Sequence, residues 1–320
     1  MPSEKNNHQQ IPATVKNPVS SIDNGSLLIV KIDKLILVPI VRTTTEEQVA
    51  GEETITEVVE RAQRLGEFDA CINGVWYDYD YLDAMDGNTS AAKTVNEGVV
   101  LLANGSRYGR TSSNGYYAAQ RANISWEFGF GDLPTIGFRT GAGGLCPLVI
   151  NGLRYGKENK YRNGVPSGAP KIGEPDHKFK SFLMQRSSAK FAALLKESAR
   201  VGKSGFGVTI NGTGYIIVQP HGASPGVKMD AFREKFIDLG CSSAMACDGS
   251  DSVFMYRKQQ NGVYGFDAKP GYLKNASMSV ALGFKSFNNS AYKAYQEYLH
   301  QEEMRRQLEE ETKKGKISSA

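Results

Sequence analysis

The fold of this chain is indicated most clearly by residues 239–252, which run Leu-Gly-Cys-Ser-Ser-Ala-Met-Ala-Cys-Asp-Gly-Ser-Asp-Ser. The residues before them, 229–239, have the amphipathic pattern of a helix that ends at Gly240. The small and apolar residues after Gly240 predict a short buried strand that ends in a turn at Asp248. A carboxylate at the end of a buried strand, on a loop too small to cover it, is a common place for acid–base chemistry. Asp248-Gly249 taken alone is more simply interpreted as an ordinary turn.

Short apolar runs separated by tight turns extend on both sides of this segment. Asn211-Gly212 between two such runs is a strong hairpin signal, and residues 54–65 have the apolar spacing of an amphipathic helix closed by Gly66. Residues 141–144 are rich in glycine and are expected to form a loop before a strand. Strands are expected over 27–32, 35–42, 69–72, 205–210, 214–219, 253–257, 263–266 and 276–284, and further helices over 188–198 and 290–312.

These elements predict an α+β fold in a single main domain, with a twisted mixed or antiparallel sheet and flanking helices. The domain is expected over residues 25–288. Residues 1–24 are polar and without periodicity, so they are expected to form a disordered tail. Residues 289–320 are expected to form a charged C-terminal helix and a loose end.

Composition excludes several classes of function. The 320 residues carry 38 basic and 34 acidic side chains, and the net charge of +4 is too weak to predict nucleic acid as a partner. No secretory signal and no apolar run long enough to cross a bilayer is visible in the sequence, so we expect no membrane partner and a cytoplasmic location. The sequence does not indicate an oligomeric state.

The cysteines and histidines do not predict a metal or cofactor site. Cys71, Cys146, Cys241 and Cys247 each lie in an apolar or strand-like context, which predicts small buried thiols and suits a reducing compartment. The four histidines lack ligand spacing, and His221 is interpreted as an ordinary loop residue. No transition metal and no cofactor is therefore expected, and a hard cation on loop aspartates is the alternative left open.

Three segments carry motifs in a fixed order. Residues 72–78 read Ile-Asn-Gly-Val-Trp-Tyr-Asp, and residues 143–152 read Gly-Gly-Leu-Cys-Pro-Leu-Val-Ile-Asn-Gly. The third segment runs from Lys-Ser-Gly-Phe-Gly at 203–207 through the helix to Asp-Gly-Ser-Asp-Ser at 248–252. In this order the motifs resemble those of the phosphodiester glycosidase family. That family has Asn-Gly-Gly-Phe/Tyr-Phe/Tyr-Asp after a strand, then a glycine stretch with Gly-Pro-Leu-Leu, then Arg-Thr-Ala-x-Gly and finally Leu-Asp-Gly-Gly-Gly-Ser-Ser.

The resemblance implies hydrolysis of a sugar–phosphate diester, in which a carboxylate serves as a base for water or as a nucleophile. Asp248 is the first candidate for that carboxylate, and Asp251 and Asp78 are secondary candidates. A solvated loop position explains Asp251 equally well, and a turn cap explains Asp78 somewhat better. The implied partner is a small phosphorylated sugar or nucleotide-like substrate.

The resemblance also implies a set of substrate-binding residues. Lys203 stands where the family has arginine and is the candidate phosphate anchor, with Arg139 as a second positive group, although a solvated surface charge is the ordinary interpretation of either. Asn73 would bond sugar hydroxyls or simply support its Asn-Gly turn, and glycine amides would approach the phosphate or simply serve a turn. We expect Asn73, Gly144 and Lys203 to share one cleft with Asp248. The complete predicted set is Asn73, Gly74, Arg139, Gly143, Gly144, Lys203, Ser204, Gly249 and Ser250.

Departures from the family pattern keep two other classes of function open. Lys203 replaces an arginine, and Ser250 and Asp251 replace two glycines. These changes suit a non-catalytic module that sequesters a phosphorylated glycan or nucleotide. The charged helix at 290–312 suits a structural or attachment protein, for example of a virus.

Overall fold

The structure of the protein, a computed structural model, describes residues 19–22, 25–42, 53–75, 77–79, 94–96, 98–109, 116–155, 199–272, 275 and 278–287. Only the backbone is described for 77–79 and 94–96. The helices expected over 188–198 and 290–312 lie outside the described residues, and so do residues 1–18 of the expected tail.

The largest sheet has seven strands in the order β1-β2-β15-β14-β16-β12-β13, and each neighbouring pair is antiparallel. The predicted hairpin at Asn211-Gly212 is confirmed, because it joins β14 to β15 and Gly212 has a φ of +81°. The strands are β1 (Val19–Ser21), β2 (Leu28–Ile32), β12 (Cys146–Ile150), β13 (Leu153–Arg154), β14 (Lys203–Val208), β15 (Gly214–Gln219) and β16 (Ser243–Ala246).

Two further sheets of five strands and a two-stranded ribbon complete the described part of the chain. One sheet has the order β18-β17-β4-β19-β3, and the other has the order β10-β9-β11-β7-β8. The strands of the first are β3 (Leu35–Val41), β4 (Ala70–Asn73), β17 (Met255–Lys258), β18 (Tyr264–Ala268) and β19 (Val280–Ser286). Those of the second are β7 (Val100–Leu101), β8 (Arg107–Tyr108), β9 (Tyr116–Gln120), β10 (Trp126–Phe130) and β11 (Thr140–Gly143), and the ribbon pairs β5 (Tyr77–Tyr79) with β6 (Thr94–Asn96).

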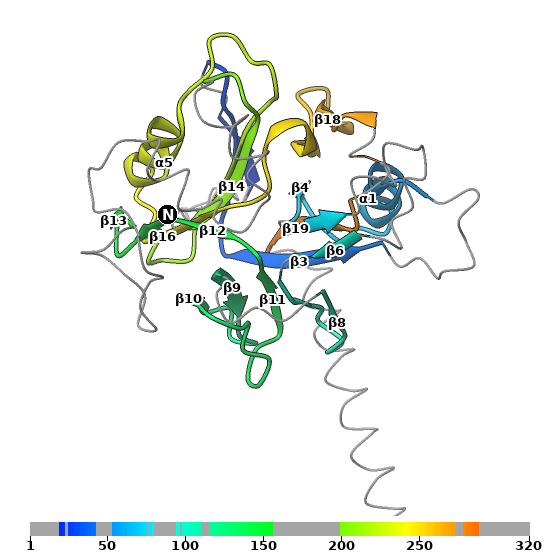
Figure 1. Cartoon of the computed structure of the whole chain (residues 1–320), viewed down its shortest axis with the longest axis vertical. Helices are drawn as coiled ribbons and strands as arrows, with labels where there is room; N and C mark the ends of the chain where they lie inside the picture. Colours follow the sequence, from blue (N-terminus) through cyan, green and yellow to red (C-terminus); the bar gives the residue numbers. More distant parts are fainter. Residues whose placement is uncertain are drawn as a thin grey trace, which may run out of the picture.

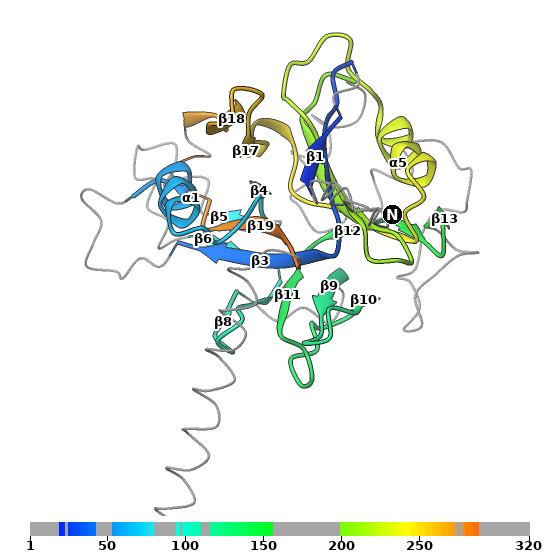
Figure 2. The same ribbon diagram turned by 180° about the vertical axis from the view of Figure 1, so that it is seen from behind.

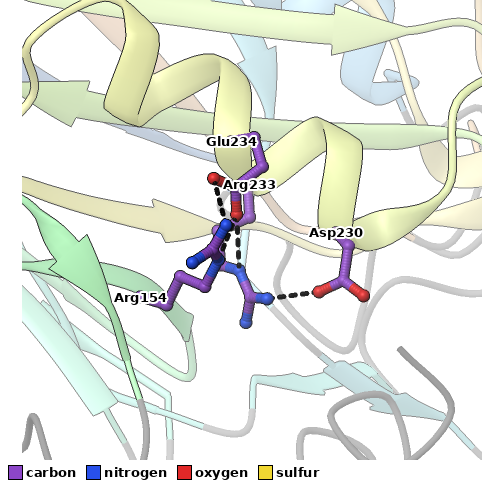
Figure 3. A network of polar contacts seen from close by, with 4 residues as sticks. All are labelled: Arg154, Asp230, Arg233 and Glu234. Carbon is purple, nitrogen blue, oxygen red and sulfur yellow. Dashed lines mark hydrogen bonds and ion pairs between the residues drawn. The ribbon is translucent and has the colours of Figure 1, made fainter. Parts of the chain in front are cut away.

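Helix α5 (Met229–Asp238) covers one face of the seven-stranded sheet. Phe232 and Phe236 are fully buried and pack with apolar residues of β12 and β16. Arg154 of β13 forms hydrogen bonds with Glu234 at 2.5 and 2.8 Å, so the edge of the sheet is tied to the helix by charge as well (Figure 3).

Helix α1 (Ile55–Arg64) covers the β18-β17-β4-β19-β3 sheet. Its start is fixed by Thr54, whose backbone N–H donates to Glu57 Oε2 at 2.6 Å. The apolar spacing predicted from the sequence is confirmed. The residues that bury its inner face are Ile55, Val58, Val59 and Ala62, packed with Phe68 and Tyr256.

One core joins all three sheets. It includes Val30 of β2, Ile72 of β4, Ala118 of β9, Phe206 of β14 and Phe284 of β19. Figures 1 and 2 show α1 and α5 on opposite sides of the molecule, with β3 crossing between them and β9 to β11 below β3. The predicted α+β class is thus confirmed, and every strand pair in the described part of the chain is antiparallel.

Two expectations differ from the structure. Residues 19–21 were expected in the tail, but they form β1 and pair with residues 30–32 of β2. The glycine-rich stretch at 141–144 was expected to be a loop, but Thr140–Gly143 is a buried strand. Glycine allows close packing there, since a Cβ on Gly141 would lie 2.8 Å from Leu133 Cδ1 and 3.3 Å from Ala118 O. Gly144, with a φ of +70°, makes the turn into β12.

Candidate functional site

The candidate site lies at one end of the seven-stranded sheet, where β16 runs out into Asp248. Ala246 of β16 is paired with Cys146 at the start of β12 and with Gly205 near the start of β14. Because these pairs are antiparallel, the turn at Gly144 and the residues before β14 come to the same end of the sheet as Asp248. The end of β15 joins them, since Gln219 is paired with Lys203.

Residues of two strands, β4 and β14, and Gly74 after β4 hold the main chain of Asp248. Its carbonyl oxygen accepts hydrogen bonds from Asn73 Nδ2 at 2.7 Å and from Ser204 Oγ at 3.0 Å. Its N–H donates to Gly74 O at 3.2 Å. Asn73 and Ser204 are both buried, so these bonds are shielded from water. The first and third motif segments therefore meet on the backbone of one residue, the candidate catalytic carboxylate.

The carboxylate of Asp248 turns back on its own loop. Oδ1 accepts the N–H of Gly249 at 2.9 Å, and the residue is half-buried. This is the turn contact expected of Asp-Gly, and it also orients the carboxylate at the end of a strand whose backbone is fixed. The turn and the catalytic interpretations of Asp248 are thus compatible.

Asp248 is followed by a short 3₁₀ helix, Ser250–Ser252. Ser250 has a φ of +64°, in the left-handed region that favours glycine, which accounts for the glycine that the family pattern has here. Its N–H donates to Gly202 O at 2.9 Å. Asp251 is half-buried and lies against Gly271, whose N–H donates to the Asp251 carbonyl at 2.8 Å.

The thiols of the described residues are buried. Burial raises the pKa of Cys71 and of Cys247 well above the usual thiol value, and burial raises the pKa of Cys241 to about 12. All four cysteines are free and buried, as the sequence predicted. Cys71, Cys241 and Cys247 are therefore neutral packing residues at neutral pH.

Lys203 does not face Asp248. It is 3% exposed, and its ammonium donates to Val201 O at 2.8 Å and to Ala199 O at 3.4 Å. Gln219 donates to the same two carbonyls at 2.8 and 2.7 Å. These bonds hold the turn that leads into β14, which is a structural role.

The alternation of side chains along β14 explains this placement. Successive residues of a strand point to opposite faces of the sheet. Ser204 points to Asp248, whereas Gly207 faces α5, since a Cβ there would lie 2.9 Å from Phe236. Lys203 shares the face of Gly207, so the expected phosphate-anchoring role is not supported by its position.

The remaining predicted residues are only partly brought together. Gly143 donates its N–H to Val99 O at 2.8 Å, and a Cβ on Gly98 would lie 2.1 Å from Gly144 N. Close approach of another backbone, rather than a phosphate, therefore accounts for this glycine pair. Arg139 precedes β11 and lies about 13 Å along the strand from Gly143. Asp78 lies in β5, but its side chain is outside the described residues.

The structure brings two further residues to this end of the sheet: Arg200, which the sequence did not single out, and His221, which was interpreted as an ordinary loop residue. Gly202 N–H donates to His221 Nδ1 at 3.4 Å, and Arg200 Nη2 donates to Gly222 O at 3.1 Å. The hairpin at Asn211-Gly212 could have indicated that these residues are neighbours. Its register pairs Lys203 with Gln219, so the residues before Lys203 lie beside those after Gln219.

Metal binding and membrane spanning concern the described part of the chain as a whole. No group of three or more His, Cys, Asp or Glu side chains there is arranged to hold a metal ion. None of its helices has the length and apolar character of a membrane span.

No protein-family model and no curated protein sequence matches this chain. The structure is similar to that of the catalytic domain of zebrafish N-acetylglucosamine-1-phosphodiester alpha-N-acetylglucosaminidase, auto-inhibited by its pro-peptide. That likeness has 12% identity, covers 84% of this chain and 81% of the other, and gives a TM-score of 0.49. A protein of Burkholderia pseudomallei described as exported has 11% identity, coverage of 81% and 73%, and a TM-score of 0.47.

A hypothetical protein from Synechocystis is also similar, at 13% identity and a TM-score of 0.37, and the matched region covers 83% of this chain but only 61% of the other protein. All three are distant likenesses of shape, with TM-scores below 0.5. We transfer no role from them to any residue of this chain.

Proposed function

We propose that this protein is a hydrolase that cleaves a sugar–phosphate diester, with Asp248 as its catalytic carboxylate. The observation that supports the proposal is the meeting of Asn73, Gly74 and Ser204 on the main chain of Asp248. These residues come from the first and third motif segments that resemble the phosphodiester glycosidase pattern.

The chemistry needs one well-placed carboxylate more than a strong acid. Phosphate on an anomeric carbon is a good leaving group, so its departure needs little protonation. The Asp248 carboxylate would take a proton from the attacking water, or would itself attack the anomeric carbon. Asp251 follows three residues later, on the same loop, and with Asp78 it is the reserve candidate.

The substrate in this proposal is a small phosphorylated sugar or a nucleotide-like diester. Residues 248–251 are half-buried, so a small ligand can reach the loop from solvent. A cytoplasmic location is also part of the proposal, since four free cysteines suit a reducing compartment.

Turnover tests the proposal. Purified protein is incubated with a panel of sugar-1-phosphate diesters and nucleotide sugars, and the release of free sugar and phosphate monoester is followed. Release that Asp248→Asn abolishes, and that Asp238→Asn at the exposed end of α5 leaves intact, supports the hydrolase. No release from any member of the panel contradicts it.

A non-catalytic binding module is the second candidate. Two observations favour it. Lys203, the cation of the third motif segment, is buried, and Ser250 has a left-handed backbone conformation where the family pattern has glycine. Saturable binding of a panel member without release, unchanged in Asp248→Asn, would favour this module over the hydrolase.

A further inference from the structure

We propose that Arg200 and His221 bind the phosphate of the substrate, an inference that rests on the proposed cleavage of a phosphodiester. A phosphodiester is an anion, and Asp248 and Asp251 place negative charge on the same loop. Positive charge close to the loop is needed to offset this repulsion. Lys203 is held by backbone carbonyls on the other face of β14, so another group must supply that charge.

Gly202 joins the Asp248 loop to the turn that carries His221. Its N–H donates to His221 Nδ1 at 3.4 Å, and its carbonyl accepts from Ser250 N at 2.9 Å. A Cβ on Gly202 would lie 2.2 Å from Ser250 O and 3.2 Å from the backbone N of His221. The His221 imidazole and the Asp248 loop therefore both contact Gly202, where there is no space for a side chain.

Arg200 is fixed to the same turn. The N–H of Gly222 donates to Arg200 O at 2.8 Å, and Arg200 Nε and Nη2 donate to Gly222 O at 3.3 and 3.1 Å. This reciprocal contact holds the guanidinium at Gly222, the residue that follows His221. Both side chains are exposed, and the guanidinium keeps its positive charge whatever else it contacts.

The chemistry of the two side chains suits a phosphate oxygen. Because His221 Nδ1 accepts from Gly202, a neutral imidazole carries its proton on Nε2 and donates there. A guanidinium beside an N–H donor is a common combination for phosphate recognition. Of two other cations, Arg139 lies at the far end of β11, and Lys269 packs on an aromatic ring, with its Nζ 5.4 Å from the ring centroid of Phe266.

NMR spectra of the full chain test this inference, with inorganic phosphate as the probe. The chain has four histidines, so the imidazole proton resonances are few, and His221→Gln identifies that of His221. We expect this resonance to shift and saturate as phosphate replaces chloride at constant pH and ionic strength. A shift that does not saturate, or none, overturns the inference.

Variants of the guanidinium sharpen the test. Arg200→Met is expected to weaken phosphate binding about three- to tenfold, as for a charge-assisted contact at an exposed site, and Arg200→Lys to restore part of the loss. Lys269→Met is the matched control, because it removes an exposed cation that packs on Phe266. Thermal melts check that each variant is folded. Unchanged affinity in Arg200→Met, or an equal loss in Lys269→Met, overturns the inference.

The outcomes separate this inference from the proposed function. Saturable phosphate binding at His221 without turnover on the diester panel would support the phosphate site and contradict the hydrolase. Turnover with a KM that Arg200→Met leaves unchanged would support the hydrolase and contradict the phosphate site.

Discussion

Two polar clusters beside the seven-stranded sheet differ in what their hydrogen bonds hold. At Asp248, neutral groups of Asn73 and Ser204 donate to a main-chain carbonyl. At α5, charged groups bond one another: Arg154 with Glu234, and Arg233 with Asp230 (Figure 3). The first cluster fixes the backbone that carries a carboxylate, whereas the second pairs carboxylates with guanidinium groups.

The difference shows how the same residue types serve two purposes. In the α5 cluster, Glu234 is bonded to Arg154 and Asp230 to Arg233, so the charge of each carboxylate is offset where it stands. In the Asp248 cluster, the bonds from Asn73 and Ser204 reach the carbonyl and hold the residue without engaging its carboxylate. These bonds fix the main chain at Asp248, while its Oδ1 accepts the N–H of Gly249.

The largest effect expected is on turnover in Asp248→Asn. The change keeps the shape of the side chain and an oxygen that can accept the Gly249 N–H, but it removes the negative charge. We expect turnover to fall about a thousandfold, within the range for loss of a general base. The assay is release of sugar and phosphate monoester, with far-UV circular dichroism as the folding check. Undiminished turnover would transfer the catalytic role to Asp251 or Asp78.

The next largest effect is on stability in Asn73→Ala. Asn73 is fully buried, and its loss leaves a small cavity and takes one of two side-chain donors from the Asp248 carbonyl. The free energy of unfolding should fall by about 2–3 kcal/mol. Urea denaturation measures it, with Asn123→Ala in an exposed turn as the control. A loss no larger than in the control would mean that the junction does not depend on this bond.

How much of this arrangement could be predicted varied with the kind of signal. The apolar spacing of α1 and the hairpin at Asn211-Gly212 are local patterns, and both were predicted correctly. The face to which Lys203 points was not, because a shift of one residue along a strand reverses every side chain. The strand at Thr140–Gly143 was missed because its glycines pack against residues that are distant in the sequence or in other strands, such as Leu133.

The candidate site shows the same limit. The order of the motifs predicted Asn73, Ser204 and Asp248 as residues of one site, but no spacing in the sequence indicates which of their atoms are in contact. The role of Asn73 as a donor to the Asp248 carbonyl, rather than to a sugar, follows only from its complete burial. Arg200 was not singled out, and His221 was interpreted as an ordinary loop residue, because a single exposed side chain has no sequence pattern of its own.

A smaller effect should separate the two clusters by their response to salt. A double-mutant cycle with Arg154→Met and Glu234→Gln is expected to give a coupling of about 0.5–1 kcal/mol, since the two side chains are 41% and 33% exposed. The coupling should fall in about 1 M sodium chloride, where exposed charges are screened. The effect of Asn73→Ala should not change with salt. A salt-independent coupling at Arg154 would contradict this distinction.

The smallest effect concerns backbone strain beside the carboxylate. Ser250 has a φ of +64°, and a left-handed conformation costs a serine about 1 kcal/mol, whereas glycine adopts it freely. Glycine also loses more chain entropy on folding, so Ser250→Gly should raise the free energy of unfolding by only about 0.5 kcal/mol. Asn151, with a φ of +52°, is the matched control, because asparagine tolerates this region and Asn151→Gly should be nearly neutral. Urea denaturation of both variants measures the difference. If Ser250→Gly gains stability but loses turnover, the serine hydroxyl serves the site, and the strain is kept for function. If the gain in stability is the same as for Asn151→Gly, the loop holds no strain beyond that of an ordinary turn.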